Sequence, residues 1–190
     1  MKNYILGEEF EGLDYSKAVF PKGDYEGCHF RNCQFANADL SGYNFEDCSF
    51  ENCDLSMITC TDTTLGEVIF RNCKMLGVHF ELCNPFLLSL YFEECFLNLA
   101  GFYNLALIGT TFKQCNLVEV DFTNTNLTQA SFEQCDLSGA IFENTTLVEA
   151  DFRTAKHYII DPEKNNIKKA KFSLSSIAGL LKKYDLVIDN

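Results

Sequence analysis

Large apolar residues recur at every fifth position along most of the chain. A first series includes Phe10, Tyr15, Phe20, Tyr25, Phe30, Phe35, Leu40, Phe45, Phe50 and Leu55, and it continues to Phe80. A second series, in which Phe and Leu alternate, extends from Phe92 to Phe152. A period of five matches neither an amphipathic helix nor a flat strand. Short fixed repeats instead predict stacked coils, each in contact with its neighbours.

The sequence also repeats with a longer period of twenty residues. The pattern Phe-x-x-Cys begins at Phe30, Phe50 and Phe70, and again at Phe92, Phe112 and Phe132. If four five-residue units complete one turn of a square coil, residues twenty positions apart lie over one another in columns. Cys33, Cys53 and Cys73 would then form one column and Cys95, Cys115 and Cys135 another, with Asn32, Asn52 and Asn72 as an outer amide ladder. Two outer columns would alternate in charge, namely Glu11, Arg31, Glu51, Arg71 and Glu93, Lys113, Glu133, Arg153.

All ten cysteines fall at positions that this pattern turns inward. Eight lie two residues before a large apolar residue of the series, Cys83 has the same place before Pro85, and Cys60 lies on the series itself. Free Cys packs as a small apolar residue, so we expect buried thiols. A zinc site would need matched C-x₂-C pairs, which the sequence does not contain, and disulfides are a third alternative.

The five-residue register slips by two within residues 84–91. Pro85 lies in this segment and removes one backbone donor, so we expect two stacked blocks joined by a bulge or a bend, with Leu87 as the first inward residue of the second block. Leu88 and four residues beyond the slip are assigned to the outside. Those four, Phe96, Leu99, Tyr103 and Ile108, form a candidate apolar interaction patch. The alternative is that the altered register or a cap buries some of these residues.

The repeat ends after Ala155, which divides the chain into a coil domain (1–155) and a C-terminal cap (156–190). Residues 160–166 read as a turn, and Ser173 or Ser175 can cap a short helix that runs to about Tyr184. Leu186 to Ile188 would follow as a short apolar strand. The cap would cover the end of the coil, whose backbone groups are otherwise unpaired.

Charge and composition favour a protein that binds other proteins. The net charge of −12 opposes nonspecific binding to nucleic acid or anionic membranes and favours a basic partner. The sequence lacks a secretory signal and an apolar stretch long enough for a membrane span, so we expect a cytoplasmic protein. His29, His79 and His157 lack a recognisable nucleophile or orienting group, and no phosphate-binding glycine motif is present. We therefore expect no enzyme activity, no cofactor and no metal site.

Several five-residue units share a common pattern, namely Ala38-Asp-Leu40-Ser-Gly42, Cys53-Asp-Leu55-Ser, Cys135-Asp-Leu137-Ser-Gly139 and Ala150-Asp-Phe152. In this pattern the chain resembles the pentapeptide-repeat family, and the resemblance covers about residues 8–155. It implies an all-β fold, a right-handed quadrilateral parallel β-helix of about seven coils. The C-terminal segment resembles the helix that caps Qnr-type members and joins two subunits. The implied dimerisation residues are Phe172, Ile177, Leu180, Leu181, Leu186 and Ile188.

The resemblance to Qnr-type members also implies a function and a partner. Those proteins imitate the shape and charge of DNA and bind DNA gyrase or topoisomerase IV. The candidate acidic binding surface here comprises Glu46, Asp47, Glu51, Asp54, Asp62, Glu67, Glu119, Asp121 and Asp136. This chain departs from Qnr-type members of Gram-negative sources because its sequence shows no long loop comparable to theirs. The alternative function is a protein-interaction scaffold that uses the apolar surface near residues 96–108.

Overall fold

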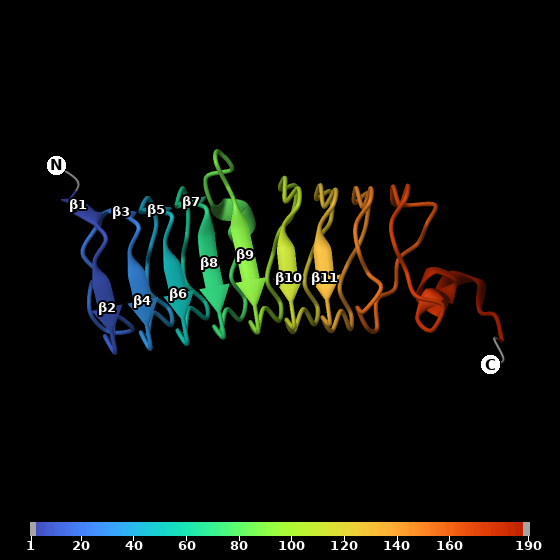
Figure 1. The fold of residues 1–190 in the computed structure, drawn as a ribbon, viewed down its shortest axis with the longest axis horizontal. Helices are drawn as coiled ribbons and strands as arrows, with labels where there is room; N and C mark the ends of the chain where they lie inside the picture. Colours follow the sequence, from blue (N-terminus) through green and yellow to red (C-terminus); the bar gives the residue numbers. More distant parts are fainter. Residues whose placement is uncertain (1–2, 188–190) are drawn as a thin grey trace.

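The computed structural model describes residues 3–187 and shows a straight rod of stacked coils with the two ends of the chain at opposite ends (Figure 1). Short strands mark successive coils. They are β1 (Asn3–Leu6), β2 (Glu9–Glu11), β3 (Gly23–Glu26), β4 (His29–Arg31), β5 (Asn44–Glu46), β6 (Ser49–Glu51), β7 (Thr64–Gly66), β8 (Val68–Arg71), β9 (Leu90–Glu93), β10 (Thr111–Lys113) and β11 (Ser131–Glu133). Three short 3₁₀ segments complete the fold: η1 (Phe80–Leu82), η2 (Ile177–Leu180) and η3 (Lys182–Tyr184).

Each coil has four faces, which we call A to D in chain order. Face A carries the sheet β11-β10-β9-β8-β6-β4-β2, and face D carries the sheet β1-β3-β5-β7; every pairing is parallel. Faces B and C are held by isolated bridges such as Gln34–Asp54 and Asp39–Thr59. Seven turns separate Phe10 from Phe152, which confirms the predicted quadrilateral β-helix.

Corners between faces require the left-handed backbone conformation. Asn32, Asn52 and Asn72 have φ of 53°, 53° and 48° at the corner after face A, and Gly42 and Gly139 occupy two other corners with φ of 68° and 69°. Asn tolerates this region better than most residues, and Gly enters it without strain. The Asn72 side chain donates to Asn52 Oδ1 at 2.6 Å, which is one rung of the predicted amide ladder.

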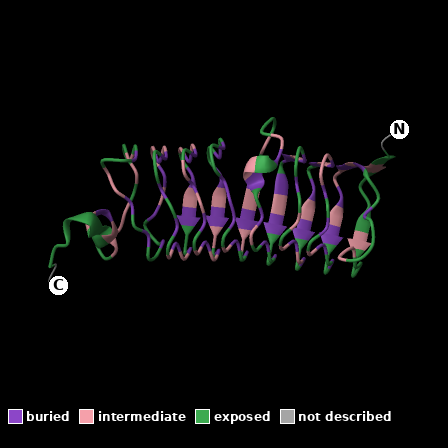
Figure 2. Ribbon diagram, turned by 180° about the vertical axis from the view of Figure 1, so that it is seen from behind, coloured by how far each residue is buried: buried purple, intermediate pink, exposed green. Residues whose placement is uncertain are grey.

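The core is a stack of aromatic and aliphatic columns, and Figure 2 colours its buried residues purple along the coils. The column of face A runs through the whole rod, from Phe10 to Phe172, with ring centroids 4.6 to 5.4 Å apart. Phe rings on neighbouring faces meet edge to face, as Phe112 and Phe122 do at 76°. Such contacts stabilise aromatic pairs beyond their buried area.

All ten cysteines are free and buried, as predicted. The two predicted cysteine columns are one column, because Lys74 pairs with Phe96 across the slip and therefore stacks Cys95 over Cys73. Each thiol in this column has a nearby backbone acceptor; Cys53 Sγ, for example, lies 3.4 Å from the carbonyl oxygen of Phe30. Thr63 occupies the equivalent position on another face and donates to the Leu40 carbonyl at 2.7 Å. Small donor side chains at this position thus satisfy carbonyls inside the rod.

The slip is a loop that projects from face D near the middle of the rod (Figure 1). Faces A, B and C pair across it with an offset of 22 residues, as in Phe70–Phe92 and His79–Gly101, whereas the face D sheet stops at β7. The inward assignment of Leu87 is wrong: its side chain is 59% exposed, and Leu88 packs against the core instead. Asn84 Oδ1 accepts the backbone N–H of Phe86, and Leu87 takes φ of 61°. Because of this turn, the inward residue is Leu88, one position later than predicted.

The C-terminal segment covers the end of the coil, but not with the predicted helix. The structure has η2 and η3 there, the residue before η2 is Ser176, and its side chain makes no capping bond. Leu186 and Val187 do not form the predicted strand, and Ile188 lies outside the described residues. Pairing also continues past residue 155, since Asp151 bridges Lys171 and Phe172 stacks on Phe152. The carbonyl oxygen of Gly179 accepts the N–H of Ile160 at 3.1 Å, which holds the cap on the coil.

Candidate protein-interaction surfaces

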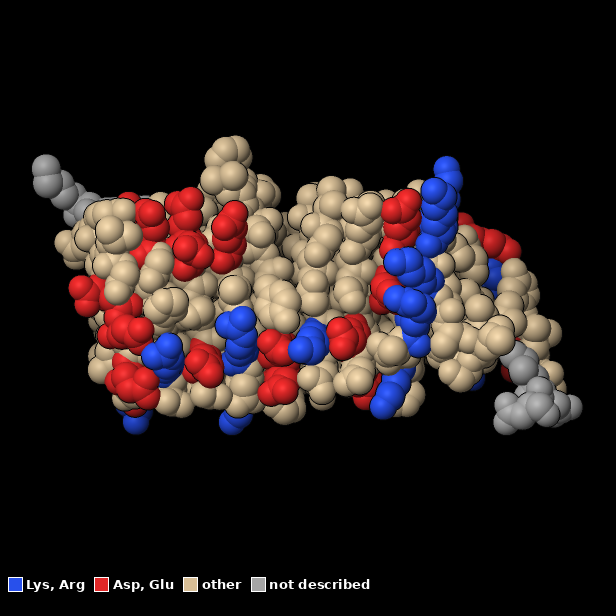
Figure 3. Space-filling view, viewed as in Figure 1, with Lys and Arg blue, Asp and Glu red and all other residues tan. Residues whose placement is uncertain are grey.

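One edge of the rod carries a group of carboxylates that form no ion pair with a described basic side chain. We call it the acidic corner; it lies between faces D and A of the first block and comprises Glu26, Glu46, Asp47 and Glu67. The register of β3, β5 and β7 stacks these positions on successive coils. Glu46, Asp47 and Glu67 are exposed and form no ion pair with a described residue, and Glu26 accepts a hydrogen bond from Tyr4 Oη at 2.6 Å. Figure 3 shows this group in red, with no blue side chain among it.

Face A has a different electrostatic character. Arg31 lies between Glu9 and Glu51, at 2.7 and 3.5 Å, and Glu93 lies between Arg71 and Lys113, at 3.4 and 2.6 Å. The hydrogen bond from Lys113, together with Arg71, lowers the pKa of Glu93. The predicted alternation of charge is therefore present, and Figure 3 shows it as a row of red and blue side chains. Charges paired in this way offer little net field to a partner.

The predicted acidic residues do not form one surface. Glu46, Asp47 and Glu67 meet at the acidic corner, whereas Glu51 is paired with Arg31 on face A. Asp54 and Asp136 are on face B, where Asp54 accepts from Ser56 N and Asp136 lies 2.9 Å from His157 Nδ1. Asp121 is on face C, and Glu119 and Asp62 occupy separate corners with φ of 57° and 56°. The predicted acidic surface did not include Glu26, although its column is that of Glu46.

The predicted apolar residues are exposed but wrap around one coil. Phe96 is on face B and Leu99 is at the next corner, whereas Tyr103 and Ile108 follow at later corners of the same turn. The corner of Leu99 continues along the rod through two exposed residues that the prediction did not include, Met57 and Leu76. Backbone bonds from Met57 N to Leu76 O and from Gly77 N to Asn98 O stack these positions. We call Met57, Leu76, Phe96 and Leu99 the apolar corner.

The predicted dimerisation residues divide into two groups. Phe172 and Leu180 face the coil end: Phe172 stacks on Phe152 at 5.4 Å, and Leu180 is buried. Leu181 is partly buried, and Ile177 and Leu186 are exposed, as are Leu174 and Val187. An exposed apolar surface therefore remains on the outer side of the cap.

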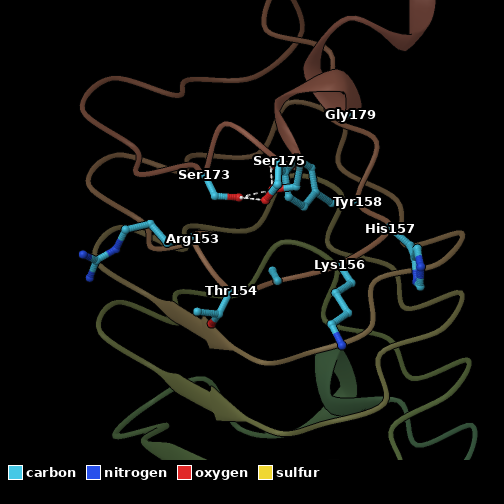
Figure 4. A pocket seen from close by; sticks show the side chains of 10 residues that line it. Arg153, Thr154, Lys156, His157, Tyr158, Ser173, Ser175 and Gly179 are labelled. Carbon is cyan, nitrogen blue, oxygen red and sulfur yellow. Dashed lines mark hydrogen bonds between the residues drawn. The ribbon is translucent and has the colours of Figure 1, made fainter. Parts of the chain in front are cut away.

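A pocket of about 450 Å³ separates the last coil from the cap (Figure 4). Ser173 Oγ lies 3.0 Å from Ser175 Oγ and 2.7 Å from Ser176 Oγ, and Tyr158 Oη donates to Ser176. In Figure 4 the side chains of Arg153, Lys156 and His157 point away from these hydroxyls. The hydroxyl groups satisfy one another, and the pocket brings no charged group toward them.

The potential metal ligands and the histidines of the described chain are dispersed along the rod. Within residues 3–187, no group of three or more His, Cys, Asp or Glu is arranged to hold a metal ion. The three histidines bond to Ser49, Glu81 and Asp136 on separate parts of the rod. No helix in the described part of the chain has the length and apolar character needed to cross a membrane.

Comparisons with known proteins agree with this geometry. Residues 23–102 match a family profile described as a pentapeptide repeat region, and residues 115–153 match pentapeptide repeats, eight copies. The chain is a pentapeptide-repeat protein. No curated protein shows significant sequence similarity to it.

Solved structures share the pentapeptide-repeat fold. A trypsin-treated variant of QnrB1, described as a plasmid-mediated fluoroquinolone resistance protein, superposes with a TM-score of 0.60 at 20% identity, with all of both chains covered. Full-length QnrB1 gives 0.49 at 19% identity, with coverage of 97% of this chain and 100% of that one. HetL from the cyanobacterium Nostoc sp. strain PCC 7120, involved in heterocyst differentiation regulation, gives 0.42 at 15% identity, with 88% and 86% covered. At these identities, the first comparison establishes the fold.

Proposed function

We propose that this pentapeptide-repeat protein is a non-catalytic binding protein whose acidic corner occupies a DNA-binding surface of a type II topoisomerase. The observation that carries the proposal is the acidic corner itself, where Glu46, Asp47 and Glu67 are exposed and form no ion pair among the described residues. Because no described basic side chain pairs with these carboxylates, they would attract a partner with a positive surface more strongly than the paired charges of face A.

The spacing of these carboxylates supports the comparison with DNA. Four carboxylates occupy three coils. With strands about 4.8 Å apart, this is roughly one charge per 3.5 Å, close to the ~3.4 Å per phosphate of a single DNA strand. The likeness in fold to QnrB1, a fluoroquinolone resistance protein, directs the choice of a type II topoisomerase as the partner.

A gyrase supercoiling assay tests this proposal, run with and without a fluoroquinolone. We expect low micromolar protein to inhibit supercoiling or to relieve the drug's inhibition. The variant Glu46→Gln/Glu67→Gln should weaken the effect about tenfold, because two unpaired charges are lost from the contact. The matched control Glu94→Gln/Glu133→Gln removes the same charge from other exposed positions and should act like the unmodified protein. No effect of the unmodified protein in either assay would refute the topoisomerase proposal.

The apolar corner supports a second candidate, an interaction scaffold for another protein. Met57, Leu76, Phe96 and Leu99 are all exposed, and three of them stack along one edge of the rod. Such a patch is typical of a protein-binding surface. Recovery of one specific partner other than a topoisomerase, lost with Leu99→Asp and retained with Glu94→Gln/Glu133→Gln, would favour this function.

A further inference from the structure

The N-terminal end of the rod exposes the edges of both sheets. β1 is the last strand of the face D sheet, and β2 is the last strand of the face A sheet. The opposite end is covered by the cap, whereas no described residue covers β1 and β2. Edge strands present unpaired N–H and C=O groups that can pair with another strand.

The bonding pattern identifies which groups point outward. At the Asp14–Gln34 bridge, Gln34 N donates to Leu13 O, and Tyr15 N donates to Gln34 O. The bridge therefore uses the N–H and C=O of Gln34 and neither backbone group of Asp14. The N–H and C=O of Asp14 therefore point away from the rod. On β2, His29 N donates to Glu8 O and Gly12 N donates to Arg31 O, which likewise directs the backbone groups of Glu9 and Glu11 outward.

The core is also incompletely covered at this end. Ile5, Phe10 and Tyr15 are only partly buried, whereas their neighbours in the next coil are buried, namely Tyr25, Phe30 and Phe35. A further strand placed on β2 would cover the face of Phe10, in the way that Phe30 of β4 covers its other side at a centroid distance of 4.7 Å. Inward-facing apolar side chains of the added strand would complete the stack.

The charges at this end indicate which kind of segment can bind there. Glu8, Glu9, Glu11 and Asp14 are exposed around it, and only Glu9 forms an ion pair with a described residue, Arg31. A second copy placed end to end would bring these carboxylates together, which is unfavourable. An extended segment with basic residues would be attracted instead.

We propose that the N-terminal end of the rod is a strand-addition site, which takes an extended segment of a partner protein with alternating apolar and basic residues. The segment pairs with the outward groups of Glu9, Glu11 and Asp14, its apolar residues cover Phe10 and Tyr15, and its bases lie beside Glu8 and Glu11. This mode of peptide recognition combines backbone bonds for affinity with side-chain pockets for specificity. The pairing groups belong to β2 and Asp14, not to Glu46, Asp47 or Glu67, so the site does not depend on the proposed topoisomerase contact.

The test uses the full-length protein and the octapeptide (Lys-Val)₄, with (Lys-Pro)₄ as a control of equal charge. Proline lacks the N–H that a ladder needs. We expect (Lys-Val)₄ to bind in calorimetry and to slow hydrogen–deuterium exchange in fragments that cover residues 3–16. Equal binding of both peptides, protection elsewhere, or no binding of (Lys-Val)₄ would overturn the proposal.

Two variants separate this site from general attraction to an acidic protein. Glu8→Gln/Glu11→Gln should weaken (Lys-Val)₄ binding about three- to tenfold at low salt, since two nearby charges are lost. Glu94→Gln/Glu133→Gln, with the same change in net charge, should leave binding unaltered. Equal weakening by both variants would contradict a localised site, as would a concentration-dependent end-to-end dimer that (Lys-Val)₄ cannot dissociate.

Discussion

Cys60 is the small residue in the inward column of face C, where its neighbours are Leu40 and Phe80. It lines an internal cavity of about 20 Å³. We predict that Cys60→Leu fills this space and raises stability by about 1 kcal/mol, or roughly 2–4 °C in Tm. Thermal unfolding followed by circular dichroism would measure the change.

Cys53→Leu is the matched control for this substitution. Cys53 lies in the continuous thiol column and does not line the cavity. Added volume should there force its neighbours apart and destabilise the protein by about 1–3 kcal/mol. A lower Tm for both variants would show that the column at Cys60 is already filled.

Burial of the thiols predicts a loss of stability in alkali. Burial raises the pKa of Cys48 from 9.0 to about 12. Above pH 9 the thiol ionises in the unfolded chain but not in the rod. The contribution of this thiol to the free energy of unfolding is therefore complete below pH 9 and is lost as pH rises toward 12. The slope from this one group is about 1.4 kcal/mol per pH unit.

Urea unfolding between about pH 8 and pH 11 would reveal this slope, and Cys48→Ala should reduce it. Alanine occupies the equivalent inward position at Ala130 and Ala150, so the variant should remain folded. An unchanged slope would mean that Cys48 does not contribute to the pH dependence.

Residue by residue, the five-residue period was sufficient to predict the inside of the rod. It identified the aromatic columns and the buried cysteines, because packing leaves only two inward positions in each five. It could not decide between Leu87 and Leu88, both apolar. That choice depends on the turn formed by Asn84 and Phe86, whose geometry the period does not describe.

Among the elements, the projecting loop is an insertion into an otherwise regular repeat. Without Pro85 and Phe86, the sequence would read Cys83-Asn84-Leu87-Leu88-Ser89, which matches Cys115-Asn-Leu117-Val-Glu119. We predict that deletion of Pro85 and Phe86 restores the 20-residue register, turns Leu87 inward and joins the two halves of face D. Hydrogen exchange at residues 64–66 should slow and Tm should rise. Faster exchange in the deletion variant would show that the loop itself stabilises the junction.

The cap depends on close approach at Gly179. A Cβ there would collide with the carbonyl oxygen of Tyr158. We predict that Gly179→Ala destabilises the cap by about 1–3 kcal/mol and exposes it to limited proteolysis, since the backbone must move and the bond to Ile160 is strained. Ala178→Ser, at an exposed neighbouring position, is the control and should be neutral. The same glycine explains why a helix predicted from the apolar spacing did not form, because Gly lowers helix propensity and contact with the coil favours tight turns.

At the scale of the whole molecule, charge is distributed unevenly along the rod. Residues 1–155 contain eight basic and 23 acidic residues, whereas residues 156–190 contain seven lysines and four acidic residues. We propose that two copies associate through the outer side of the cap, where Leu174, Ile177 and Leu186 are exposed. Their basic surroundings would repel each other, so added salt should strengthen the dimer.

Light scattering at tens of micromolar would show twice the monomer mass, and Leu174→Asp/Leu186→Asp should reduce it to a monomer. A monomer mass for the unmodified protein at every salt concentration would exclude this association.

The candidate surfaces were less predictable than the fold. The repeat showed which acids face outward, but a binding surface depends on which of them share a corner and lack a base. Glu46 and Glu51 are five residues apart, yet the first has no ion pair with a described residue and the second lies 3.5 Å from Arg31. That difference arises from contacts between coils, which a single period does not specify.

The interruption of face D gives the rod one compliant joint. Among the described residues, no backbone bond joins the loop at 84–88 to residues 105–108 of the next coil, so these coils are held on faces A, B and C only. Bending that opens face D there breaks no backbone ladder, whereas bending in any other direction must separate paired strands. The rod can therefore flex in a single plane so that both blocks contact a partner longer than one block. The acidic corner ends beside this joint, and its orientation relative to the second block would change with that flexing.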